Sequence, residues 1–155
     1  MITIGSLFSG AIDGMTLGFQ MASDKYTPIV ANEIENTAIK TAQLNYDHRI
    51  IQDDVRNISI EEYRECDIIL GTFPCQEYSR AAHIRDLFLH FFRFIAIIQP
   101  EIYLWENSPE VRNFPIVMEA FRKLPPYDYY ELELDTFDFK LPQRRKRLFV
   151  IGFKK

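Results

Sequence analysis

Short apolar runs alternate with amphipathic stretches along this chain, and the alternation predicts strands connected by helices. The apolar runs lie at residues 2–8, 28–33, 49–52, 68–70, 101–105, 127–134 and 147–153, and most have the length of a buried strand. Helices are predicted at 15–22, 35–44, 84–98 and 108–123, with a brief helix or turn at 59–64. Strands that alternate with helices favour a doubly wound α/β fold. We therefore expect a mostly parallel seven-stranded sheet with an antiparallel last strand.

The composition indicates a single globular domain. The 155 residues are 47% hydrophobic and 14% aromatic, which excludes a disordered chain. No apolar run of about 18 residues predicts a membrane span, and the first residues lack the features of a signal peptide. Two cysteines, Cys66 and Cys75, are too few for a disulfide framework, so we expect reduced thiols and a cytoplasmic protein. His83 and His90 are interpreted as ordinary polar or packing residues, and no metal is expected.

The net charge of −4 is unusual for a protein that binds nucleic acid, but the charges are unevenly distributed. Residues 140–155 contain seven Lys or Arg and no acid, whereas the rest of the chain has 11 basic and 22 acidic residues. The basic residues interleave with Leu148-Phe149-Val150-Ile151, which is typical of a strand. We interpret this segment as a local phosphate contact that is too small to bind DNA strongly by itself.

Polar residues follow the first three predicted strands. Gly10 and Gly14 lie in a turn between strand and helix, which lets the backbone approach a nucleotide-like ligand, although an ordinary tight turn is the more frequent reason for such spacing. Glu33 ends the second strand 19 residues after Gly14. That distance suits an acid that binds a ribose, but a solvated glutamate at a helix start fits it too. Asp54 follows the third strand and could reach an adenine amino group.

A cysteine follows the fourth strand, within Gly71-Thr72-Phe73-Pro74-Cys75. Pro74 has a fixed φ angle, so the loop is stiff, and open α/β sheets bind ligands at this edge. A buried structural cysteine would fit the same pattern. The fifth strand leads into Glu106-Asn107-Ser108, so polar residues gather at one edge of the predicted sheet.

Taken in order, these segments resemble the motifs of the DNA cytosine-5 methyltransferase family over nearly the whole chain. The motifs are Phe8-x-Gly10 with Gly14, Glu33, Asp54-Val55, Pro74-Cys75-Gln76 with Ser79, Glu106-Asn107-Ser108 and Gln143-x-Arg145-x-Arg147. The resemblance implies a Rossmann-like S-adenosylmethionine-dependent methyltransferase fold. It also implies methyl transfer from S-adenosylmethionine to carbon 5 of cytosine in DNA, with Cys75 attacking carbon 6 of a base that has left the stack.

The resemblance further implies a role for each residue of the site. The catalytic residues would be Cys75, Glu106, Arg145 and Arg147. The cofactor-binding residues would be Phe8, Ser9, Gly10, Gly14, Glu33, Ile34, Asp54, Val55 and Pro74. The substrate-binding residues would be Gln76, Ser79, Asn107 and Gln143.

The chain departs from the family pattern in two places. Only residues 77–86 separate Gln76 from Leu87, where the family has a longer loop that closes over the flipped base. No target recognition domain or final conserved helix follows Lys155. We therefore expect a minimal or split enzyme, with DNA as substrate and either a second subunit that carries the recognition domain or a homo-oligomer. Two alternatives are a non-catalytic cofactor-binding or degenerate subunit, and an RNA cytosine methyltransferase.

Overall fold

The computed structural model describes residues 1–74 and 81–155, with side chains after the gap described from residue 86. Within this part, seven strands form one sheet in the order β3-β2-β1-β4-β5-β7-β6. Neighbouring strands are parallel from β3 to β5, and β7 is antiparallel to both β5 and β6. The expected parallel sheet with an antiparallel last strand is confirmed. The strands are β1 (Ile2–Leu7), β2 (Tyr26–Glu33), β3 (Arg49–Gln52), β4 (Ile68–Gly71), β5 (Ile102–Asn107), β6 (Tyr127–Asp135) and β7 (Lys146–Lys154).

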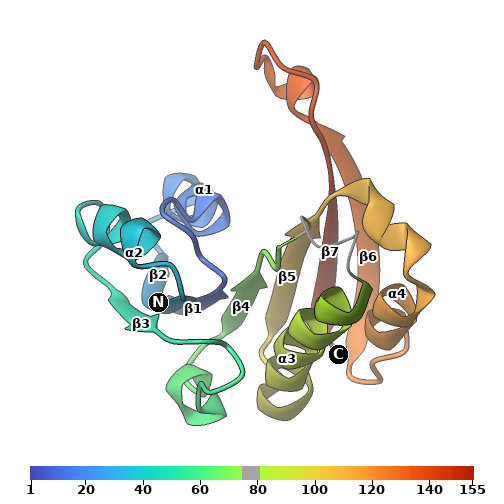
Figure 1. Ribbon diagram of the computed structural model, residues 1–155, viewed down its shortest axis with the longest axis horizontal. Helices are drawn as coiled ribbons and strands as arrows, with labels where there is room; N and C mark the ends of the chain where they lie inside the picture. The colour runs from blue at the N-terminus through green and yellow to red at the C-terminus, as the bar shows by residue number, and fades with distance from the viewer. Residues whose placement is uncertain (75–80) are drawn as a thin grey trace.

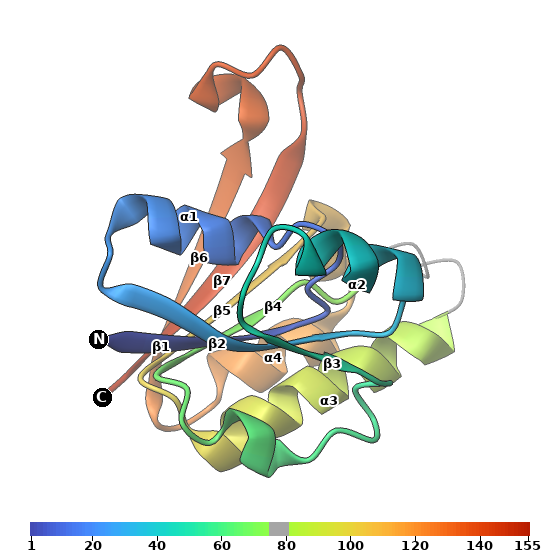
Figure 2. The ribbon, with the colours of Figure 1, turned by 90° about the vertical axis from the view of Figure 1, so that its left-hand side faces the viewer.

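Helices cover the two faces of the sheet unequally (Figures 1 and 2). One face carries α1 (Gly14–Ala22) and α2 (Asn36–Gln43), which lie over the β1–β3 side. The other face carries α3 (Ala81–Ile98), α4 (Pro115–Arg122) and the short 3-10 helix η1 (Ile60–Tyr63). The larger apolar core lies beneath α3 and α4, and it includes Phe88, Phe91, Phe94, Trp105 and Phe121, each fully buried.

A smaller core lies on the α1 side of the sheet. It is formed by Ile4, Ile68 and Leu70, with Met15 and Phe19 of α1 packed against them. Tyr26, Ile102 and Leu104 extend this contact across the sheet only as far as β5. The α1 face of β7 and β6 therefore has no helix over it among the described residues (Figure 2).

The single helix expected over residues 108–123 is wrong. The segment forms the 3-10 helix η2 (Pro109–Asn113) followed by α4, because Pro115 disfavours the helical conformation of the residue before it. Phe114 accordingly has φ −113° and ψ 82°. Strand β5 also continues two residues beyond its expected end and takes in Glu106 and Asn107.

Strands β6 and β7 are joined by the 3-10 helix η3 (Thr136–Phe139) and the turn that follows it, and β7 starts at Lys146, one residue before its expected start. This connection projects from the rest of the molecule in both ribbon views (Figures 1 and 2). No helix in the described part of the chain is long and apolar enough to cross a membrane.

Candidate functional site

The turn after β1 has a backbone conformation that few residues adopt. Phe8 has φ 59° and Gly10 has φ 66°, both in the left-handed region where a side chain is disfavoured. The Ser9 amide donates a hydrogen bond to the Asn32 carbonyl at 2.9 Å. This bond ties the turn after β1 to the end of β2, so the first two strand ends form one unit.

Glu33 holds this unit together through its side chain. One carboxylate oxygen accepts a hydrogen bond from the Gly10 amide at 2.7 Å. The other accepts from the amides of Ile34 and Glu35 at 2.8 and 2.9 Å. A carboxylate oxygen can accept more than one hydrogen bond. Glu33 can therefore hold the turn and still accept from a ligand hydroxyl.

A hollow of about 450 Å³ opens beside Glu33, between the ends of β1, β2 and β4. Six of the nine residues predicted to bind cofactor line it: Phe8, Glu33, Ile34, Asp54, Val55 and Pro74. Ser9 and Gly10 belong to the adjoining turn, and Gly14 lies at the start of α1. Asn32 joins the hollow to β3, since its side-chain amide donates to the carbonyls of Ile51 and Asp53 at 3.2 and 2.7 Å.

Asp54 lies at the rim of this hollow beside a cation. Arg56 donates to one Asp54 oxygen from its backbone amide at 2.9 Å and from its side chain at 3.0 Å. Partial burial raises the pKa of Asp54, but the Arg56 hydrogen bonds outweigh it and the net pKa is lowered. The carboxyl is thus an ionised hydrogen-bond acceptor at the rim of the hollow.

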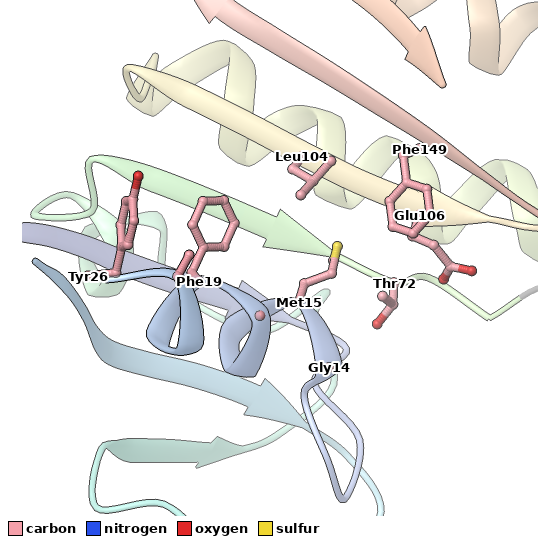
Figure 3. A pocket seen from close by; sticks show the side chains of 10 residues that line it. Gly14, Met15, Phe19, Tyr26, Thr72, Leu104, Glu106 and Phe149 are labelled. Atoms are coloured by element: carbon pink, nitrogen blue, oxygen red, sulfur yellow. The ribbon is translucent and has the colours of Figure 1, made fainter. Parts of the chain in front are cut away.

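A second, mostly apolar hollow of about 600 Å³ adjoins the first, on the α1 side of the sheet. Figure 3 shows Met15 and Phe19 of α1 facing Leu104 and Phe149 of β5 and β7, with Thr72 and Glu106 at one end. Gly14 lines this hollow and not the first. Thr72 lines both, so the two hollows meet at the end of β4.

Glu106 and Arg147 form an ion pair at this junction. The Arg147 Nε lies 2.8 Å from Glu106 Oε1, and both side chains are 21% exposed. Burial raises the pKa of Glu106, against the opposing charges of Arg147 and Arg145. A carboxyl with a raised pKa holds its proton more strongly than an ordinary carboxyl and can act as a general acid at higher pH. The pair joins β5 to β7, although its members are 41 residues apart in the sequence.

Asn107 supports the loop after β4. Its buried side-chain amide donates to the Phe73 carbonyl at 3.0 Å and accepts from the Ser108 amide at 2.8 Å. This holds the backbone two residues before Cys75 in the sequence. Thr72 adds a second tie, because its hydroxyl donates to the Phe8 carbonyl at 2.7 Å.

The three predicted residues Cys75, Gln76 and Ser79 lie outside the described part of the chain. The other cysteine, Cys66, is buried, and burial raises the pKa of its thiol to about 12. A thiol with that pKa remains protonated at neutral pH and is a poor nucleophile. Cys66 is therefore a packing residue.

The remaining predicted residues lie farther from the hollows. Arg145 and Gln143 are exposed on the loop between β6 and β7, and neither lines either hollow. Sequence reasoning missed Thr72, Asn32 and Arg56. Arg56 and Asn32 each adjoin a predicted residue, and Thr72 lies two positions before Pro74. The amide contacts of Asn32, however, depend on how β2 and β3 pair. Among the described residues, no group of acidic, His or Cys side chains is arranged to hold a metal ion.

Comparison with known proteins places this geometry in a family. Residues 2–155 match the model of the C-5 cytosine-specific DNA methylase family. The chain is 31% identical to type II methyltransferase M.Bsp6I from Bacillus sp. (strain RFL6), over 99% of this chain and 53% of that protein. It is 35% identical to type II methyltransferase M.FnuDI from Fusobacterium nucleatum, over 97% of this chain and 46% of that protein. The chain thus spans about half the length of these curated relatives.

Solved structures share the fold. The Dnmt2 methyltransferase of S. pombe superimposes with a TM-score of 0.83 at 21% identity, covering 99% of this chain and 49% of that one. The methyltransferase EhMeth of Entamoeba histolytica gives a TM-score of 0.81 at 22% identity, covering 99% of this chain and 53% of that one. These likenesses confirm the Rossmann-like methyltransferase fold expected from the sequence. With the family model matched over nearly all its residues, the chain belongs to the C-5 cytosine-specific DNA methylases.

Proposed function

We propose that this chain carries the catalytic half of a DNA cytosine-5 methyltransferase, with S-adenosylmethionine as methyl donor. The observation that carries the proposal is the meeting of two hollows at Thr72. One is lined by six residues with predicted cofactor roles, and the other contains Glu106 paired with Arg147. A cofactor and a base could then meet at the end of β4, where Cys75 follows in the sequence.

The residues of the first hollow fit an adenosine group. Glu33 has free acceptor capacity for ribose hydroxyls beside its backbone contacts, and Asp54 is an ionised acceptor for the adenine amino group. The Ser9 hydroxyl is buried and has no hydrogen-bond partner among the described residues. A buried hydroxyl in that state favours a polar ligand group at the turn. S-adenosylmethionine bound there would supply an electrophilic methyl group.

The proposed chemistry uses the protein side chains in a fixed order. The Cys75 thiolate attacks carbon 6 of cytosine, and the ring becomes nucleophilic at carbon 5. Glu106 stabilises the charge that develops at the ring nitrogen by donating a hydrogen bond or proton. Arg147 keeps Glu106 in place and offers a cation to the base carbonyl. After methyl transfer, a water molecule removes the proton from carbon 5, the electron pair of that bond expels the Cys75 thiolate from carbon 6, and Glu106 takes back any proton that it gave to the ring nitrogen.

Two experiments test this proposal. Isothermal titration with S-adenosylmethionine should show at least about tenfold weaker binding for Glu33→Ala, since charge-assisted hydrogen bonds contribute about 1.5–3 kcal/mol each. In the presence of S-adenosylmethionine and the second polypeptide proposed below, DNA that carries 5-fluorocytosine should form a stable adduct with the wild-type chain and with Cys66→Ala, but not with Cys75→Ala. Cofactor binding without any adduct would favour the non-catalytic alternative. An adduct with RNA but not with DNA would favour the RNA alternative.

We further propose that a second polypeptide completes the enzyme by covering the open α1 face of β5, β7 and β6. That face is apolar, and Tyr130, Leu132 and Phe153 remain 53, 47 and 45% exposed there. Contiguous exposed apolar surface indicates an interaction site. The chain spans about half the length of these relatives, and we propose that the partner supplies the part that carries target recognition.

The second-polypeptide proposal is tested by reconstitution. Co-expression with the product of a neighbouring reading frame should restore methyl transfer to DNA, and Leu132→Asp should abolish the restoration. Leu44→Asp is the matched control. Leu44 is 86% exposed and follows α2, on the side of β3, which is the edge of the sheet opposite to β6. A homodimer that methylates specific sites without any partner would refute the proposal.

A further inference from the structure

Arg56 fixes the orientation of the Asp54 side chain at the rim of the first hollow. The Asp54 Oδ1 accepts hydrogen bonds from the Arg56 amide at 2.9 Å and from the Arg56 Nε at 3.0 Å. Within the described part of the chain, the Asp54 Oδ2 accepts no hydrogen bond. Both residues line the hollow. Asp54 therefore has one oxygen held by Arg56 and one oxygen that can accept from a ligand.

Helix α3 holds Arg56 through a second acid. The Arg56 Nη1 lies 3.3 Å from the Asp86 Oδ2, and the Nε2 of His90, one turn along α3, lies 3.3 Å from the Asp86 Oδ1. Leu87, which follows Asp86, lines the first hollow. The rigid fork of a guanidinium can donate to two acids at once. Arg56 thus joins Asp54 to α3.

A second arginine fixes the backbone of the loop after β3. The Arg93 Nη2 on α3 donates to the carbonyls of Val55 and Ile58 at 3.4 and 3.3 Å. The side chains of Val55 and Ile58 are only 3 and 6% exposed, so the loop cannot leave α3 without exposing apolar surface. The two arginines therefore act on different parts of the loop. Arg93 holds its backbone, and Arg56 holds the carboxylate that faces the hollow.

We propose that Arg56 is a positioning residue that makes the first hollow selective for adenine by fixing Asp54, with Asp86 as its anchor on α3. The inference rests on the proposed function, which places the adenosine group in this hollow. Adenine carries an amino group at carbon 6, from which an ionised carboxylate can accept. Hypoxanthine carries an oxygen there and an N–H on the neighbouring ring nitrogen. A fixed carboxylate would repel that oxygen, whereas a carboxylate able to turn could accept from the neighbouring N–H.

Isothermal titration with S-adenosylhomocysteine and S-inosylhomocysteine tests the proposal, because the two compounds differ only in the purine. The wild type should bind the adenine compound about a hundredfold more tightly, within the range of one hydrogen bond to a charged group. Arg56→Met removes the guanidinium and keeps a long side chain, so this ratio should fall to about tenfold or less. Asp86→Asn should lower the ratio by only about two- to fivefold, since both side chains of that pair are partly exposed.

A double-mutant comparison shows whether Arg56 acts through Asp54. Asp54→Asn should itself lower the ratio, and adding Arg56→Met to it should change the ratio no further, because no carboxylate remains to be positioned. Arg64→Met is the matched control. It breaks an exposed ion pair with Glu61, and neither residue lines the first hollow. This control should keep the wild-type ratio, and every variant should keep nearly wild-type thermal unfolding.

Two results would overturn the inference while leaving the proposed function intact. The first is Arg56→Met that weakens binding of both compounds equally, which would make Arg56 a general support of the loop. The second is Arg56→Met that lowers the ratio as much in the Asp54→Asn background as in the wild type, which would mean that Arg56 contacts the base itself. A wild-type chain that binds neither compound would overturn the cofactor site of the proposed function together with this inference.

Discussion

Asn107→Asp tests how strongly the hydrogen bond from Asn107 to the Phe73 carbonyl supports the backbone before Cys75, without changing Cys75 itself. The change is almost isosteric, and it replaces the Asn107 N–H donor with an oxygen. The Phe73 carbonyl would lose its hydrogen bond and face a carboxylate oxygen at a similar distance, 3.0 Å in the wild type. The bond from the Ser108 amide, 2.8 Å in the wild type, would remain.

The expected loss of stability follows from the burial of this contact. Asn107 is only 3% exposed, so water cannot replace the lost donor. A buried polar group without a partner costs about 1–3 kcal/mol, and two facing oxygens add to that, giving about 2–4 kcal/mol. A domain stable by about 5–15 kcal/mol would still fold. The rate of adduct formation with 5-fluorocytosine should fall as the loop loses its fixed position.

The loss of stability can be measured by urea unfolding, monitored through the fluorescence of Trp105, which is fully buried and is the only tryptophan. The deficit of the variant should be largest at neutral pH and should shrink as the pH falls. The new carboxyl has a raised pKa in the folded state because burial and the carbonyl oxygen disfavour its charge. Once protonated it donates to the Phe73 carbonyl, so folding gains stability as the pH falls through that pKa.

Asn113→Asp, on exposed η2, is the control, and it should stay within about 0.5 kcal/mol of the wild type. The reasoning would be refuted if Asn107→Asp matched the control at neutral pH. It would also be refuted if the deficit were the same at acid and neutral pH.

Three further changes test other parts of the structure. Burial raises the pKa of Glu106 in the folded protein. The free energy of unfolding of the wild type, measured in urea, should therefore fall relative to that of Glu106→Gln as the pH rises from the unfolded-state pKa of Glu106 through its folded-state pKa. A difference that is independent of pH would contradict this. Lys140 has φ 64°, so Lys140→Gly should raise the free energy of unfolding by about 0.5–1 kcal/mol while Lys140→Ala leaves it unchanged. A Cβ on Gly152 would overlap the Tyr103 ring, so Gly152→Ala should lower the free energy of unfolding by about 1–3 kcal/mol. Gly18→Ala, in open space on α1, should raise it instead. Thermal or urea unfolding measures both.

From the sequence alone we predicted the strands and a mostly parallel sheet. We also predicted that Glu33, Asp54 and Glu106 gather at one edge of that sheet. Periodicity succeeds there because each strand is a local pattern with one buried face. It could not predict that β7 lies between β5 and β6, since either antiparallel arrangement buries the same residues. The resemblance to the family, not the pattern, linked Glu106 to Arg147.

The missed contacts share a physical cause. The Asn107 amide binds the Phe73 carbonyl, and the Asn32 amide binds two carbonyls after β3. In both cases the acceptor is a backbone carbonyl. Every residue has one, so the residue type does not indicate the contact. The break in the helix at Pro115 was visible in the sequence, because a proline restricts the residue before it. The expectation of an unbroken helix gave that rule too little weight.

The order β5-β7-β6 has a consequence for the sequence of events during synthesis. Until residues 146–154 have left the ribosome, β5 is an open edge strand and β6 has no partner in the sheet. Glu106 would then be without Arg147, and the apolar face next to Leu104 would be exposed to other chains. The Glu106–Arg147 ion pair can therefore form only after β7 has been synthesised. A ribosome that pauses after β6 would hold the chain with β5 as an unpaired edge strand.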